Sequence, residues 1–135
     1  MWTGAWAPGA RLFATGSRDK QLRVWSFDPA APACPAEPAL SLSRLRAAVT
    51  AVAFAPVPLQ GALALAVGFE CGAVSLLRLE EGSAGELSAR EVWDAGPLLR
   101  HAAAVRAIRW LASADALHMA TCSSDHALRV FRVER

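Results

Sequence analysis

One polar turn recurs three times along this chain, spaced about 50 residues apart, and each copy separates two apolar runs. The first copy spans residues 12–25 and the last spans residues 118–131, with Asp19 and Asp125 in their turns. A weaker copy lies between them, and Cys71 takes the place of the aspartate there. One such unit cannot bury its apolar face alone, so neighbouring units must pack against each other. The sequence therefore predicts a repeat protein, a class suited to binding rather than to catalysis.

Every copy also carries the signals of short β-strands. Residues 22–25 and 128–131 alternate apolar and polar side chains, which is typical of a half-buried strand. Further strand-like segments are found at 2–6, 49–54 and 105–110, and fourth strands are predicted at 40–45 and 87–93. Four short strands per repeat form one blade of a β-propeller. The predicted fold class is all-β: a partial β-propeller of about three four-stranded blades.

The repeats cover approximately 1–46, 47–95 and 100–135, so that 1–135 is one partial propeller region. A closed propeller needs roughly four blades or more, and three repeats therefore predict an open arc. The last repeat offers no candidate for an outer strand after its third one, so its blade is expected to lack that strand. We expect the terminal part of a larger propeller or a truncated product. A three-repeat protein that is completed by a partner is the alternative.

Composition argues against several classes of function. The net charge of +2 is too small for strong steering toward nucleic acid. Cys34, Cys71 and Cys122 form neither a disulfide framework nor a CxxC zinc motif. Reduced thiols are therefore expected, with Cys71 and Cys122 packed as small apolar groups. No cofactor and no metal are predicted.

The chain shows no sign of a signal peptide or a membrane span. No basic segment precedes an apolar one at its start. The most apolar region, 47–69, is interrupted by Pro56, Pro58 and Gly61, and we interpret it as two strands joined by a loop. A cytoplasmic location is expected, and presence in the nucleus is left open. The proline-rich loop at 28–39 is interpreted as a tolerated insertion, with a docking peptide of polyproline type as the alternative.

The turn residues point to a known family. The first repeat resembles the end of a WD repeat, with Asp19 in the hairpin turn and Trp25 closing the strand. The last repeat resembles the same motif through His101 and Asp125, with Phe131 where the family has tryptophan. The resemblance implies a structural blade network, in which a histidine, a strand serine or threonine, the aspartate and the tryptophan share hydrogen bonds. The first and third repeats each hold part of this network, and the middle repeat is expected to hold none.

A second resemblance covers nearly the whole chain. Residues 48–52, the stretch Gly68-Phe-Glu-Cys-Gly72 and the pairs at 125–126 and 132–133 resemble the C-terminal blades of Elongator complex subunit 2. This resemblance implies a scaffold subunit of the complex that modifies wobble uridines of transfer RNA, with the chemistry in a different subunit. The partners that it implies are other Elongator subunits and the remaining propeller blades.

The chain offers little that predicts catalysis. Ser124, Asp125 and His126 are the residue types of a catalytic triad, but three adjacent residues in a hairpin turn cannot line up as nucleophile, base and orienting group. We interpret them as a structural turn, because serine and aspartate bond their own backbone there. No glycine-rich phosphate loop is found in the sequence. An enzyme is therefore the least favoured of three hypotheses.

Arginines gather in the last repeat and form one candidate surface. Its strands place them in different alternation phases, so an ordinary blade surface is the expected interpretation. The alternative is a basic rim that meets an acidic partner or makes a weak RNA contact. The residues are Arg100, Arg106, Arg109, Arg129 and Arg132.

The leading hypothesis is a non-catalytic protein-interaction scaffold that resembles part of the Elongator subunit 2 propeller. The alternative is a generic WD-repeat adaptor for another complex, such as a ubiquitin ligase receptor or a trafficking platform. The general repeat motif fits both, and only the surroundings of residues 70–72 favour the first.

Overall fold

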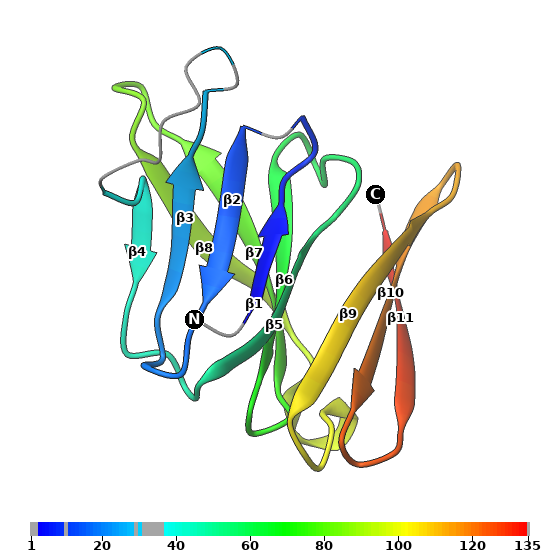
Figure 1. Ribbon diagram of the computed structural model, residues 1–135. Helices are drawn as coiled ribbons and strands as arrows, with labels where there is room; N and C mark the ends of the chain where they lie inside the picture. The colour runs from blue at the N-terminus through cyan, green and yellow to red at the C-terminus, as the bar shows by residue number, and fades with distance from the viewer. Residues whose placement is uncertain (1–2, 10, 29, 31–36, 135) are drawn as a thin grey trace.

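The computed structural model describes residues 3–9, 11–28, 30 and 37–134, and these form three antiparallel sheets in an open arc (Figure 1). The first sheet contains β1 (Thr3–Trp6), β2 (Leu12–Gly16), β3 (Leu22–Ser26) and β4 (Leu40–Leu42). The second contains β5 (Val49–Phe54), β6 (Leu63–Phe69), β7 (Val74–Glu81) and β8 (Leu87–Asp94). The third contains β9 (Val105–Ala112), β10 (Ala116–Ser123) and β11 (Leu128–Glu134).

Within each sheet the strands follow chain order, and every neighbouring pair is antiparallel. The one short helix, α1 (Gly96–Leu99), connects the second and third sheets within the described part of the chain. The first strands of the three sheets, β1, β5 and β9, lie side by side along the inner line of the arc (Figure 1). This arrangement confirms the all-β partial propeller, and within the described residues the third sheet has three strands and no outer fourth one, as predicted.

Some predicted strand bounds were wrong. The fourth strand of the first sheet ends at Leu42 rather than at residue 45, because Arg44 has a φ of 57°, which an extended strand cannot contain. In the other direction, β9 continues past its predicted end to Ala112. Residues 1–2, 10, 29, 31–36 and 135 lie outside the described residues, and with them much of the proline-rich loop, including Cys34.

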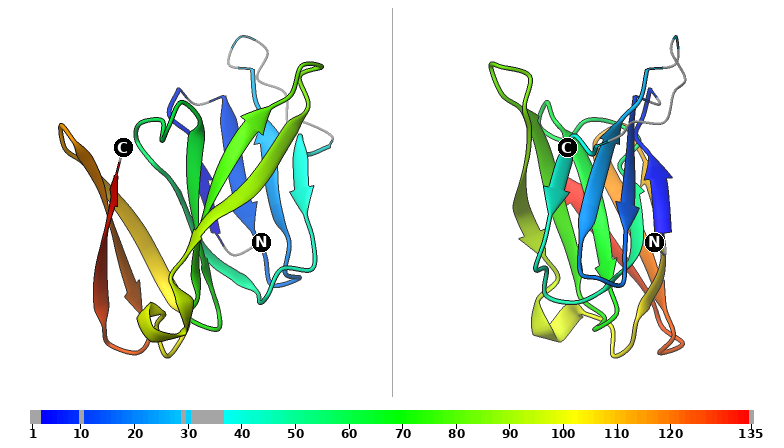
Figure 2. Two further views of the ribbon diagram at one scale, coloured as in Figure 1. Left: turned by 180° about the vertical axis from the view of Figure 1, so that it is seen from behind. Right: turned by 60° about the vertical axis from the view of Figure 1, so that its left-hand side comes forward.

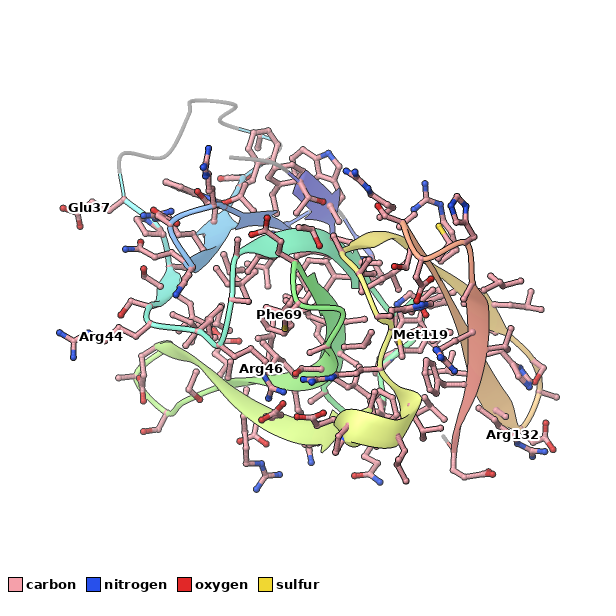
Figure 3. All side chains as sticks on the ribbon, turned by 90° about the horizontal axis from the view of Figure 1, so that it is seen from below. Glu37, Arg44, Arg46, Phe69, Met119 and Arg132 are labelled. Carbon is pink, nitrogen blue, oxygen red and sulfur yellow. The ribbon has the colours of Figure 1, made fainter. Side chains whose placement is uncertain are left out.

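Two apolar cores hold the arc together, one between each pair of neighbouring sheets. Figure 3 looks along the strands and shows Phe69 between the first two sheets and Met119 between the second and third. Alternation along β3 buries Leu22 and Val24 fully against the second sheet. Burial of whole apolar side chains stabilises by about 1.5–3 kcal/mol each, so the sheet-to-sheet cores dominate the stability of the fold.

The prediction that Cys71 and Cys122 pack as apolar groups was wrong, because both side chains are exposed. Cys71 lies in the turn between β6 and β7, beyond the end of the packed strands. Cys122 follows the buried Thr121 in β10, and alternation turns it to the opposite face of the third sheet. Among the described residues no further sheet covers that face.

Candidate functional site

Three side chains of the third blade meet in one hydrogen-bonded cluster. His101 precedes β9, Thr121 lies in β10, and Asp125 lies in the turn between β10 and β11. The His101 Nδ1 atom is 3.2 Å from one Asp125 carboxylate oxygen, and His101 Nε2 is 2.8 Å from the Thr121 hydroxyl. The cluster therefore ties the connection before the blade to its central hairpin.

The direction of each hydrogen bond in the cluster follows from which groups can donate and which can accept. A carboxylate only accepts hydrogen bonds, so His101 Nδ1 carries a proton and donates it to Asp125. In the neutral imidazole Nε2 then accepts a hydrogen bond from the Thr121 hydroxyl. These residue types also form catalytic triads, yet His101 is 1% exposed and Thr121 is 0% exposed. Because no substrate can reach a hydroxyl buried in this way, the arrangement is structural.

Asp125 is the most heavily bonded residue of the cluster. The Ala102 amide donates to one carboxylate oxygen at 2.9 Å, and the Ala127 amide donates to the other at 2.8 Å. The hydrogen bond from the Ala102 amide lowers the pKa of Asp125 most, burial acts against it, and Ala127 and His101 lower it further, to about 2. Ser124 and His126 occupy the same turn, as predicted.

The first blade holds the complementary half of such a network. The Trp25 indole nitrogen donates to the Thr15 hydroxyl at 3.1 Å. Asp19 accepts from the Gln21 amide at 3.1 Å and pairs with Arg23 at 3.2 Å, and its side chain is 47% exposed. Burial acts to raise the pKa of Asp19, but the bonds with Ser17, Arg23 and Gln21 outweigh it and lower the pKa. The structure thus brings Trp25 to the strand threonine, whereas the Asp19 side chain bonds only within its own hairpin.

The two threonines are the functional residues that the sequence analysis missed. Thr15 and Thr121 each stand four positions before the turn aspartate, and each is buried. The shared Ala-Thr pair in the two copies was the signal that could have identified them. In the middle blade the matching residue is Val67, which cannot donate or accept a side-chain hydrogen bond.

The middle turn is shaped by close contact with the third repeat. Gly72 has a φ of 89°, and a Cβ atom there would lie 2.0 Å from the His101 carbonyl oxygen. A Cβ on Gly68 would lie 2.6 Å from the Val105 side chain. The His101 amide donates to the Gly72 carbonyl at 2.9 Å. The third blade therefore packs closely against the Gly68-Phe-Glu-Cys-Gly72 stretch.

Arg46 makes a second junction that the sequence did not reveal. It follows β4 and pairs with Glu91 at 3.1 Å and with Asp94 at 2.7 Å, both in β8. Its guanidinium also lies 5.6 Å from the centre of the Phe69 ring (Figure 3). A backbone hydrogen bond from Gly96 lowers the pKa of Asp94 most, and Arg46 lowers it further. Acidic side chains on a fourth strand thus bind an arginine from the preceding segment.

The arginines of the last repeat do not share one face. Arg109 and Arg132 pair across the sheet with Ala120 and His118, on the side facing away from the second sheet. Arg129 pairs with the buried Thr121 and therefore lies on the opposite side. Arg106 donates to Ser124, and Arg100 follows the short helix. Arg132 points outward in Figure 3.

A groove of about 800 Å³ runs between the second and third sheets. Its walls come from β8 and β11, with Trp93 and Phe131 in edge-to-face contact at 5.0 Å. Among the described residues no group of three His, Cys, Asp or Glu side chains is placed to hold a metal ion. In that same part of the chain, none of the helical structure has the length and apolarity needed to cross a membrane.

The fold, the turn aspartates and the threonine bonds define a partial β-propeller with WD-type blades. Residues 2–26 match the family model described as WD domain, G-beta repeat. Along its length the chain is similar to Elongator complex protein 2. It is 31% identical to that protein of Dictyostelium discoideum over 99% of this chain and 29% identical to that of Homo sapiens over 100%.

Similarity extends to a fungal relative. The chain is 40% identical to Elongator complex protein 2 of Schizosaccharomyces pombe over 58% of its own length. It spans 16% of the length of the Dictyostelium protein and 18% of the human one. The similarity therefore concerns one part of those proteins.

Proposed function

We propose that this chain is a non-catalytic interaction scaffold and that it serves an Elongator assembly. The observation that carries the proposal is similarity to Elongator complex protein 2 over nearly the whole chain, in organisms as distant as Dictyostelium and human. The buried His101–Thr121–Asp125 cluster supports it, because these side chains brace a blade and are closed to a substrate. Rigid blades with exposed turns are suited to hold several proteins in place.

The finer proposal concerns partners and cellular role. The partners are other Elongator subunits together with remaining propeller blades, and the process served is wobble-uridine modification of transfer RNA. Presence in the cytoplasm, and in the nucleus as a second compartment, belongs to the same proposal. The similarity to the named relatives supports these statements, and the resemblance of residues 68–72 to that subunit agrees with them.

Co-purification tests the scaffold role directly. The tagged full chain is expressed in cells that contain Elongator, and its co-purifying proteins are identified by mass spectrometry. Elongator subunits are the expected result, and depletion of the chain should lower modified wobble uridine in transfer RNA. Recovery of a ubiquitin ligase or a trafficking complex without Elongator subunits would instead support the generic WD-repeat adaptor.

A further inference from the structure

A pocket of about 490 Å³ lies between the first and second sheets, next to the connection from β4 to β5. Seen from behind, β4 in cyan and β8 in yellow-green are the outermost strands of these two sheets, and both contribute to the pocket wall (Figure 2). All four strands of both sheets are described, so the pocket requires no strand beyond them. Its volume falls within the roughly 300–1,000 Å³ that is typical of ligand sites.

The walls of the pocket are mostly apolar. They come from facing strands of the two sheets, with the residues Leu22, Leu42, Val67, Phe69 and Leu77. Figure 3 shows Phe69 in the space between the two sheets. A ligand that fills the pocket therefore needs an apolar body, which gains free energy by leaving water.

Ser75 supplies a polar group on the wall formed by the second sheet. Its neighbours Val74 and Leu76 pack toward the third sheet, so alternation along β7 directs Ser75 toward the first. The residue is 3% exposed, and its hydroxyl oxygen has no hydrogen-bond partner among the described residues. Buried hydroxyl groups are normally bonded, because an unpaired one is unfavourable. The Ser75 hydroxyl is therefore the group to which a ligand can bond.

Arg46 lies at the same end of the pocket as Ser75. Ser75 pairs with Asp94 across β7 and β8, and Asp94 binds Arg46. Arg46 and its other partner, Glu91, both line the pocket, and Figure 3 shows Arg46 beside Phe69. A guanidinium has more N–H donors than these two ion pairs use, so it can also donate to a neutral acceptor. One cation between two carboxylates does not attract an anion, which argues for an uncharged ligand.

These properties select one protein side chain. The ligand is uncharged, has a large apolar body, and ends in a group that both donates to and accepts from its neighbours. Tyrosine meets all three conditions, whereas tryptophan only donates, phenylalanine does neither, and serine and threonine lack the apolar body. Tyrosine is also one of the residues that most often anchor a protein interface by filling a pocket.

We propose that the pocket between the first and second sheets binds a tyrosine side chain of a partner protein. The ring lies against Phe69 and Leu77, the phenol exchanges a hydrogen bond with Ser75, and Arg46 donates to the phenol oxygen. A phosphate on this tyrosine places about two negative charges near Glu91 and Asp94, and it therefore prevents binding. The proposal rests on the scaffold function and names one contact through which that function is carried out.

A titration with side-chain analogues tests the proposal. The probe is N-acetyltyrosinamide, an uncharged mimic of a tyrosine within a chain, and binding to the full chain is measured by ligand-detected saturation-transfer NMR. Saturable binding is expected with a Kd on the order of 1 mM, because the probe is small. N-acetylphenylalaninamide should bind about fivefold more weakly, since it lacks the hydroxyl, and N-acetylphosphotyrosinamide should not bind.

Ser75→Ala isolates the hydrogen bond. The variant should bind the tyrosine and phenylalanine probes equally, and this double-mutant comparison assigns the fivefold preference to the contact between the two hydroxyl groups. Without a probe the variant should be as stable as wild-type chain in thermal melts, because the hydroxyl has no partner to lose. A preference for tyrosine that persists in Ser75→Ala, or a loss of stability in the empty variant, would overturn the assignment.

A second variant blocks the pocket. Ala89 of β8 lines it, and Ser88 beside it is exposed on the opposite face of the same strand. Ala89→Phe should abolish binding of the tyrosine probe, and Ser88→Phe should leave it unchanged, with thermal melts as the check on folding. Equal effects of these two substitutions on binding would overturn the proposed location. Tighter binding of the phosphotyrosine probe than of the tyrosine probe would show that Arg46 selects an anion and would also overturn the proposal.

The outcome is separable from the scaffold proposal. Recovery of Elongator subunits with wild-type chain, together with no binding of the tyrosine probe, would refute the tyrosine site and leave the scaffold role intact. Probe binding that depends on Ser75, without recovery of Elongator subunits, would support the site and move the chain to another complex.

Discussion

Asp125 joins the connection before β9 to the β10–β11 hairpin, because it accepts hydrogen bonds from His101 and Ala102 in that connection and from Ala127 in its own turn. Asp19, in the matching turn, is more exposed, and its described contacts stay within its own hairpin, to the Gln21 amide and to Arg23 of β3. We therefore expect Asp125→Asn to lower Tm by several degrees and Asp19→Asn to change it little. Thermal melts of the two variants at neutral pH measure this difference. Equal and negligible effects would contradict a stabilising role for the third-blade cluster.

The low pKa of Asp125 also predicts a pH dependence. Its folded-state pKa is about 2 against an ordinary value of 3.8, so the folded chain favours the carboxylate more than the unfolded chain does. This contribution is complete above the unfolded value and is lost as the pH falls through the folded value. Between about pH 4 and about pH 2 the stability of wild-type chain should fall more steeply than that of Asp125→Asn. Denaturant titrations across this range compare the slopes, and parallel curves would refute the assignment.

Gly72 tests the close contact between the second and third repeats. Alanine at this position combines a left-handed φ, which costs about 1–2 kcal/mol, with a clash against the His101 backbone worth about 1–3 kcal/mol more. Gly61 is a matched control, because its φ is 82° but a Cβ atom there meets nothing within 4 Å. Gly72→Ala should therefore destabilise more than Gly61→Ala in chemical denaturation. Equal losses would show that the His101 backbone moves away at no cost.

At the scale of elements, Thr121 ties β10 to the connection that precedes β9. Thr121→Val keeps the shape and leaves the His101 ring nitrogen without its partner in a buried site, which should cost about 1–3 kcal/mol. Thr15→Val in β2 should cost less, because the Trp25 indole is half-buried and can find water. Unfolding free energies of both variants decide the matter. A larger loss for Thr15→Val would mean that the first-blade bond matters more.

The strands were predictable because their signal is local. The alternation in residues 22–25 and the strand-like apolar segment at 49–54 predict strands whose observed bounds match closely. The end of β4 depends on the left-handed conformation of Arg44. Arginine, unlike glycine or asparagine, does not indicate this conformation in a sequence. Cys122 is exposed because it lies on the face of the third sheet that no described sheet covers. A local sequence pattern does not indicate which of the two faces is covered. Likewise, the Arg46 pairs with β8 span residues far apart in sequence.

At the scale of the whole molecule, the first and second sheets pack in the same way as the second and third. Among the described residues, the outer face of the first sheet and the outer face of the third sheet have no such neighbour. Trp110 of the third sheet packs on the second sheet, and its indole donates to the Ala53 carbonyl at 3.1 Å. By strand register Trp6 is the matching residue of the first sheet, and it is 51% exposed. On the third sheet, Leu111, Leu128 and Val130 lie on the open face and are 60–69% exposed.

These two open faces predict head-to-tail association of the isolated chain. The first sheet presents an aromatic face around Trp6, as the third sheet presents Trp110 to the second. The outer face of the third sheet corresponds to the face of the second sheet against which Trp110 packs. Exposed apolar faces of this kind promote association, and a contact between different faces joins copies into chains or rings. Sedimentation velocity at several concentrations should therefore show assemblies larger than a monomer.

Complementation of two single-face variants tests the geometry of this association. Trp6→Asp removes the aromatic face and Val130→Asp removes the receiving face, so each variant alone should sediment as a monomer. When the two variants are mixed, the intact face of one can bind the intact face of the other, and the mixture should form a dimer but nothing larger.

Thiol alkylation gives a second measurement of the same contact. Cys122 lies on the receiving face and should react more slowly with a thiol-alkylating reagent in the dimer, with the exposed Cys71 as internal reference. Wild-type chain that stays monomeric at all concentrations would refute association itself. Association that persists in either variant alone would show that one face pairs with the same face of a second chain. The contact between chains would then differ from the contact between neighbouring sheets within one chain.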